Sequence, residues 1–172
     1  MIAAYVRAMD WLNRACVFLA GLALVVITLI IPYGVFTRYV LDSAASWPEP
    51  MAILLMIWLS FLSAVVCYRE HLHIAVGILP NALKGNARKA LGMLIEACML
   101  FMNFFMFWYG IGLIKTTWYQ SIAEFPIVSV GVSYLPVPIG GLITVLFIIE
   151  RFLVGNYFPP PVEDALETIS AE

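Results

Sequence analysis

Four long apolar segments without a charged residue constrain the fold of this chain more than any other feature of its sequence. They cover residues 15–37, 51–68, 97–114 and 125–149. A helix of about 20 apolar residues, at a rise of ~1.5 Å per residue, crosses the ~30 Å hydrocarbon core of a bilayer. Only helices and closed barrels span lipid, because unpaired backbone groups are costly there. Barrel strands would give short alternating segments, so the sequence predicts an all-α integral membrane protein with four transmembrane helices.

The composition agrees with a chain that has the bilayer as its solvent. Of the 172 residues, 63% are hydrophobic and 12% are charged, whereas a soluble domain carries about 25% charged residues. The net charge of −2 leaves no basic surface to neutralise phosphates, which excludes nucleic acid as a partner. Cys16, Cys67 and Cys98 all lie within apolar stretches. We interpret them as small packing residues and not as a disulfide framework.

Two prolines set the expected start of the fourth helix. Pro136 and Pro138 fall in the middle of the last apolar segment. A proline inside a helix removes a hydrogen bond and clashes with the preceding turn, whereas the first turn tolerates it. We therefore prefer a fourth span at 136–154 to a longer, kinked helix. The predicted spans are 15–37, 51–68, 92–114 and 136–154, within a membrane domain of residues 1–157.

The distribution of lysine and arginine predicts the orientation. The N-terminal region, the second loop and the C-terminal segment share one side and carry seven basic residues, namely Arg7, Arg14, Arg69, Lys84, Arg88, Lys89 and Arg151. The other side carries only Arg38 and Lys115. Because basic residues concentrate in cytoplasmic loops, we expect both termini in the cytoplasm.

Several segments outside the spans are expected at the membrane surface. Residues 2–14 place apolar side chains on one helical face and read as an interfacial lead-in to the first span. The loop 72–89 is apolar but broken by glycine and proline, so we expect it to lie along the cytoplasmic interface near lipid headgroups. The strict alternation over 128–134 predicts an extended interfacial segment. The tail 158–172 is acidic, which predicts a disordered cytoplasmic peptide.

Few polar residues lie within the predicted spans, and each is a functional candidate by default. Glu96 shares a helix face with Asn103, seven residues later. It is either a proton- or substrate-binding carboxylate, or a structural group bonded to a neighbouring helix or to Lys89. We favour the structural interpretation, because one carboxylate without a deep partner is a poor relay.

Two histidines follow the second span. His71 and His73 are two residues apart, so on a helix they would point to different faces. Haem ligation in a bundle needs histidines that face each other from within the helices. We therefore interpret the pair as interfacial residues and expect no cofactor and no metal.

The segment 46–49 (Ser-Trp-Pro-Glu) opens the second span with the spacing of a capping box. Ser46 would cap the first free amides, and Glu49 would bond back to the N–H of the cap. The acid also suits the positive end of the helix dipole, and Trp47 suits the aromatic belt at the membrane interface. Pro50 at the fourth position would remove the first intrahelical bond. A contact with a partner subunit could use the same residues.

Small residues recur on the second helix at a spacing of three to four. They are Ser60, Ser63, Ala64 and Cys67. Such a face lets helices approach closely. It serves either packing inside the bundle or an interface with a second protein, and the sequence leaves both open.

Several segments resemble the DctQ-type small membrane subunit of tripartite ATP-independent periplasmic (TRAP) transporters. They are residues 35–40 (VFTRYV), 46–49 (SWPE), 58–62 (WLSFL), 69–76 (REHLHIAV) and 134–140 (YLPVPIG). The similarity covers about 5–157, nearly the whole chain. The residues that match the family pattern are Arg38, Trp47, Glu49 and His73, with Pro138 in the Pro-Ile-Gly start of the last helix. Pro50 and Gly77 depart from it, standing where glutamate and aspartate are common.

The resemblance implies a non-catalytic subunit in the inner membrane of a bacterium. It would scaffold a large multi-span permease subunit and help to dock a periplasmic substrate-binding protein. Uptake of organic acids would be driven by a sodium or proton gradient. The sequence agrees, because it shows no deep charge cluster, broken-helix pair or inverted repeat, which self-sufficient transporters tend to have. The candidate interface or structural residues are Arg38, Trp47, Glu49, Ser60, Ala64, His73, Glu96 and Pro138.

Two other functions remain as alternatives. A membrane anchor of a redox complex would hold haem or quinone through the histidines. A small proton-coupled exporter would have a similar size and number of spans. It would need an acidic residue deep in the bundle, and the first predicted span has none.

Overall fold

The computed structural model describes residues 2–43, 45–70, 86–122 and 125–154. His73, the loop 72–85 and the tail 158–172 lie outside the described residues, so the predictions for them stay predictions. Within the described residues the order is α1 (Ile2–Tyr39), α2 (Pro48–Arg69), α4 (Asn86–Thr117), β1 (Ser121–Ile122), β2 (Phe125–Ser129), α5 (Val130–Tyr134) and α6 (Pro136–Val154). Four of these segments are long and apolar enough to cross a membrane, which confirms the predicted class of fold.

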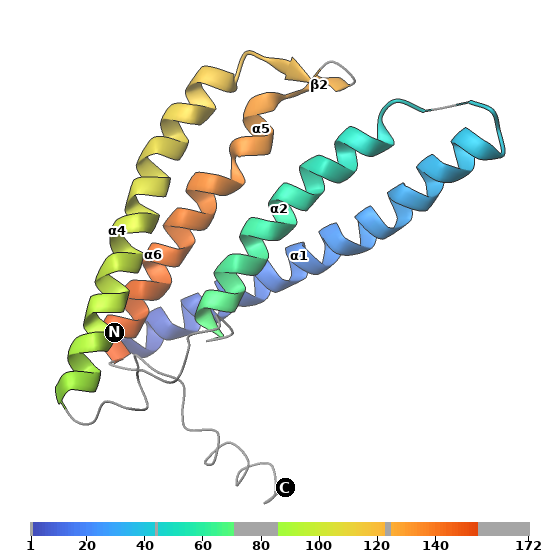
Figure 1. The fold of residues 1–172 in the computed structure, drawn as a ribbon. Coiled ribbons are helices and arrows are strands. Elements are labelled where there is room, and N and C mark those ends of the chain that lie inside the picture. Colours follow the sequence, from blue (N-terminus) through green and yellow to red (C-terminus); the bar gives the residue numbers. More distant parts are fainter. Residues whose placement is uncertain (1, 44, 71–85, 123–124, 155–172) are drawn as a thin grey trace, which may run out of the picture.

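The long helices form two arms, α1 with α2 and α4 with α6 (Figure 1). We call the end of the bundle that holds Ile2 and Val154 the terminal end. The opposite end, which holds Tyr39, Pro48 and Thr117, is the hairpin end. The arms meet at the terminal end and diverge toward the hairpin end. The main contact between the arms is that of α2 with α6, and Trp58 Nε1 of α2 also donates to the Val132 carbonyl of α5 at 3.2 Å.

The first helix is longer than its predicted span. It runs without interruption from Ile2 to Tyr39, whereas the sequence predicted a span of 15–37 and an interfacial lead-in. No glycine or proline occurs in the first 20 residues, so nothing in the local sequence separates the lead-in from the span. The third long helix likewise extends beyond 92–114, from Asn86 to Thr117.

The start of α2 corrects the predicted capping box. The N-cap is Trp47 and not Ser46, and no side chain bonds to the free amides of the first turn. The frame moves by one residue because Pro48, with its fixed φ, occupies the first helical position. The first intrahelical bond runs from the Met51 N–H to the Trp47 carbonyl at 3.2 Å. Pro50 is therefore at the third position, where a missing N–H loses no intrahelical partner.

Only the first part of the segment that was predicted to be extended, 128–134, belongs to a strand. Strand β2 pairs antiparallel with β1 and ends at Ser129, after which Val130–Tyr134 forms the short helix α5. The Ser129 side chain caps α5 by accepting a hydrogen bond from the Gly131 N–H at 3.0 Å. The alternating pattern failed here because it does not register the N-cap at Ser129, a residue type that favours a helix start.

Helix α6 begins at Pro136, and Pro136 and Pro138 are both buried in its first turn. Pro138 packs against α4 so tightly that a Cβ at Gly110 would lie 2.9 Å from its Cδ. One turn along α6, a Cβ at Gly141 would lie 2.9 Å from the Asn103 carbonyl oxygen. Two glycines on facing helices therefore allow α4 and α6 to approach closely.

The buried core lies between α1, α2 and α6 near the terminal end. Its members include Cys16, Ala20, Leu62, Val65, Ile143, Phe147 and Ile148. Large apolar side chains also cover the outside, for example Phe18 at 69% exposure and Phe101 at 70%. Apolar patches of this extent are not found on soluble monomers, which agrees with an outer surface that faces lipid.

Candidate functional site

Polar side chains from all four long helices gather at the terminal end. We call this group the terminal-end cluster, and its members are Asp10, Asn13, Tyr68, Arg69, Glu70, Glu96, Glu150 and Arg151. Each contributing helix is apolar up to this point and turns polar within its last or first turns. The cluster therefore sits where the two arms meet.

The most deeply buried member is Glu96, at 2% exposure. Its Oε1 accepts a hydrogen bond from Arg151 Nη1 at 2.9 Å, and its Oε2 accepts one from the Tyr68 hydroxyl. Arg151 also donates to the Tyr68 carbonyl, and its guanidinium lies 4.1 Å from the centroid of the Tyr68 ring. The cation that contacts Glu96 is thus Arg151 of α6 and not Lys89 of its own helix, which corrects that part of the prediction.

A second arginine joins three helices. Arg69 donates from Nε and Nη2 to the two carboxylate oxygens of Glu150, at 3.1 and 2.9 Å. The same Nη2 lies 2.7 Å from Asp10 Oδ1. This bidentate pairing with Glu150 is the strong, directional form of an ion pair. The guanidinium also lies 5.1 Å from the centroid of the Phe147 ring.

The cluster fixes how the arms are joined. Glu96 and Arg151 link α4 to α6, while Arg69 links α2 to α1 and α6. Asn13 of α1 adds a 2.7 Å hydrogen bond to Glu70, directly after α2. Buried ion pairs are weak sources of net stability, but removal of one partner leaves an uncompensated charge. The geometry thus suits a rigid joint.

Sequence reasoning did not find this joint. Arg69 entered the sequence analysis through the orientation and the family resemblance and Arg151 only through the orientation, while Asp10 and Glu150 had no role. One sequence feature could have indicated the joint: basic and acidic residues end several predicted spans on the same side of the membrane. Their pairing depends on the rotation of each helix, which the sequence does not give.

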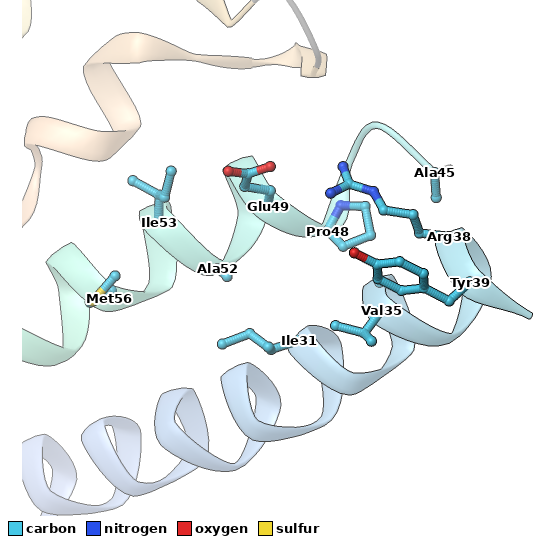
Figure 2. Close-up of a pocket in the computed structure, with 11 residues that line it drawn as sticks. Ile31, Val35, Arg38, Tyr39, Ala45, Pro48, Glu49, Ala52, Ile53 and Met56 are labelled. Atoms are coloured by element: carbon cyan, nitrogen blue, oxygen red, sulfur yellow. The ribbon is translucent and has the colours of Figure 1, made fainter. Parts of the chain in front are cut away.

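A groove between α1 and α2 occupies the other end of the first arm. This hairpin-end groove has a volume of about 370 Å³ and is lined by Ile31, Gly34, Val35, Arg38, Tyr39, Ala45, Pro48, Glu49, Ala52, Ile53 and Met56. Arg38 and Tyr39 extend from the end of α1 toward the first turn of α2, where Pro48 and Glu49 lie (Figure 2). The Trp47 ring, next to Glu49 in the chain, packs on Tyr33 with centroids 5.6 Å apart. Arg38, Trp47 and Glu49, which resemble the family pattern, therefore lie at or beside this groove.

Two of the four small residues of α2 lie on the outside of the bundle. Ser60 and Ala64 are both exposed, and the Ser60 hydroxyl donates to the Met56 carbonyl of its own helix at 2.8 Å. Packing inside the four helices therefore does not account for these two residues. Their surface faces lipid or another protein.

Metal ligation has no support among the residues that the structure describes. No group of three or more histidine, cysteine, aspartate or glutamate side chains comes together there. His73 is outside this part of the chain.

Comparison with known proteins decides the family. The family described as tripartite ATP-independent periplasmic transporters, DctQ component, matches residues 27–155. The chain belongs to the DctQ family. Two proteins of Haemophilus influenzae that carry the designation TRAP transporter small permease protein are similar along most of their length. One is 25% identical over 154 residues, covering 86% of this chain and 91% of the other. The second is 20% identical over 156 residues, covering 90% and 93%.

Membership gives the structural features a context. This DctQ component is a TRAP transporter small permease subunit and a multi-pass protein of the inner membrane. Arg38, Trp47, Glu49 and Pro138 lie within the matched range, and their roles stay predictions. Two of its local features, the joint at the terminal end and the groove at the hairpin end, differ in character. The first is a network of paired charges that borders a hollow of about 370 Å³, and the second is a largely apolar groove with charges at its rim.

Proposed function

We propose that this DctQ subunit is a non-catalytic scaffold in a secondary transporter for organic acids. It would support a large multi-span permease subunit and help to dock a periplasmic binding protein, while that permease couples uptake to a sodium or proton gradient. The observation that carries the proposal is the distribution of charge along the helices. The stretches 15–37, 51–68, 97–114 and 136–149 contain no charged residue, so the middle of the bundle offers no charged group for an anionic substrate.

The terminal-end cluster supports the same role. A carboxylate that moves protons or binds cargo needs access to them, whereas both oxygens of Glu96 are engaged by Arg151 and Tyr68. A joint of this kind favours a fixed body over a moving one. The extensive exposed apolar surface leaves room for a membrane partner as well as lipid.

We also propose that the terminal end faces the cytoplasm. Arg7, Arg14, Arg69 and Arg151 lie at this end, against Arg38 and Lys115 at the hairpin end. This asymmetry supports the orientation through the preference of basic residues for the cytoplasmic side. Single cysteines at position 7 and position 115, labelled with an impermeant thiol reagent in a background without native cysteines, would test it. Labelling of position 7 in intact spheroplasts would contradict the proposal.

Reconstitution into liposomes tests the scaffold role. The subunit alone, the large permease alone and both together are placed in vesicles with a sodium or proton gradient, with the binding protein outside. Uptake of labelled mono- and dicarboxylic acids should need both membrane subunits and the binding protein. Gradient-driven flux through vesicles that contain only this subunit would refute the scaffold role, and so would full uptake without it.

A further inference from the structure

The rim of the hairpin-end groove carries two opposite charges that do not pair with each other. Arg38 ends α1 and Glu49 lies in the first turn of α2, and both side chains are exposed. Among the residues that the structure describes, the ion pairs are those of Arg69 and Arg151 at the other end of the bundle. The lining of the groove therefore includes one cation, at the end of α1, and one anion, in the first turn of α2 (Figure 2).

Below the rim the groove is apolar. Ile31 and Val35 line it from α1, and Ala52, Ile53 and Met56 line it from α2. Val35 and Ile53 are 53% and 51% exposed, so the groove opens onto the outer apolar surface. Its volume of about 370 Å³ is within the range of small-ligand clefts, about 300–1,000 Å³.

This polarity matches the direction of a phospholipid in a bilayer. The charged rim is at the ends of two spanning helices, at the depth of the headgroups, and the apolar floor runs toward the hydrocarbon core. Arginine binds phosphate oxygens well because its planar fork donates two hydrogen bonds. A carboxylate beside it accepts hydrogen bonds from a primary ammonium group. A headgroup with a phosphate and a primary ammonium satisfies both charges.

We propose that the hairpin-end groove is a binding site for phosphatidylethanolamine. Arg38 binds the phosphate, Glu49 accepts hydrogen bonds from the ammonium, and one acyl chain lies along Ile31, Val35 and Met56. Phosphatidylcholine lacks N–H donors, and phosphatidylglycerol lacks the cation. Both are therefore poorer ligands. The site does not depend on the scaffold role proposed above.

Native mass spectrometry of the purified full chain, reconstituted in nanodiscs with equal amounts of the three lipids, tests the site. We expect one retained lipid per chain, with phosphatidylethanolamine preferred over phosphatidylcholine and phosphatidylglycerol. Glu49→Gln should lower phosphatidylethanolamine retention about fivefold and shift the preference toward phosphatidylglycerol. Arg38→Gln should lower retention of phosphatidylethanolamine and of phosphatidylglycerol. Lys115→Gln, which removes a charge at the same end but on α4, is the matched control and should have no effect.

A variant that leaves the rim charges in place separates the acyl-chain slot from the headgroup site. Val35→Trp fills the groove from an exposed position, so it should reduce lipid retention without lowering the thermal stability. Equal retention of the three lipids, or retention that neither Arg38→Gln nor Glu49→Gln changes, would overturn the proposal. A photo-crosslinker at position 35 that captures the large permease subunit, with no phosphatidylethanolamine in the purified complex, would show a protein interface instead and would also overturn it.

Discussion

Arg151 on α6 and Glu96 on α4 form a buried ion pair, with 2.9 Å between Nη1 and Oε1. The two residues are 55 positions apart in the chain. Their side chains are 13% and 3% exposed, so neither charge is well solvated. The pair holds the second arm together at the point where it meets the first.

Removal of one member should destabilise the protein more than removal of both. Glu96→Ala leaves the Arg151 charge buried without its acid, which costs about 3–5 kcal/mol in comparable pairs. The double variant Glu96→Leu/Arg151→Met should recover most of that loss, because an apolar pair carries no desolvation penalty. Thermal unfolding in detergent measures both. Additive losses in the double variant would show that the two residues do not act as a pair.

Glu96→Gln should leave the pH dependence of uptake unchanged in the reconstituted transporter. The amide keeps an oxygen that accepts from Arg151, but it carries no negative charge and cannot bind a proton. If Glu96 is a structural group, the rate of uptake against pH keeps its shape, although the yield of protein falls. A flattened or displaced pH profile at equal protein content would assign Glu96 a role in proton movement.

The two acids that contact Arg69 should differ in importance. Glu150 makes two hydrogen bonds to Arg69 and its side chain is 12% exposed, whereas Asp10 makes one and is 46% exposed. Water screens the exposed pair, so its contribution is small. We expect Glu150→Gln to lower the midpoint of thermal unfolding clearly more than Asp10→Asn. The reverse order would mean that the link from α2 to α1 is the stronger one.

Close packing of α4 against α6 should make one glycine intolerant. In Gly141→Ala the new Cβ would lie 2.9 Å from the Asn103 carbonyl oxygen, so the helices must separate. Overpacking of this kind costs about 1–3 kcal/mol. Gly112→Ala is the control, since nothing lies within 4 Å of its added Cβ. Because alanine is the better helix former, Gly112→Ala should be neutral or slightly stabilising by the same thermal assay.

Trp47→Ala should weaken uptake by lowering the yield of the complex and not by changing substrate affinity. Its ring packs on Tyr33 at the opening of α2, and aromatic pairs contribute about 0.5–1.5 kcal/mol. Glu49→Ala should act in the same direction. Co-purification with the large permease subunit and the substrate Kd of the binding protein with the complex are the two readouts. An unchanged yield with an altered Kd would contradict this role.

Prediction from the sequence succeeded for features of the fold that a single segment determines. Lipid requires each spanning backbone to satisfy its own hydrogen bonds, so four uncharged apolar runs were enough to predict four helices. The ring geometry of Pro136 placed the first turn of α6. The same rules missed by one residue at Ser46, because Pro48 started α2 first, and they missed α5, because the cap at Ser129 outweighed the alternating pattern.

The sequence by itself thus determined the number of spans and their apolar lengths, since these follow from the chemistry of each segment in lipid. The matching segments also indicated the DctQ family before any fold was known. Only the tertiary structure decided that Arg69 pairs with Glu150 and Arg151 with Glu96, and that Arg38 and Glu49 share a groove. These relationships depend on the rotation and crossing of helices far apart in the chain. Packing at Gly110 and Gly141, for example, brings α4 and α6 together, and no single segment encodes such a contact.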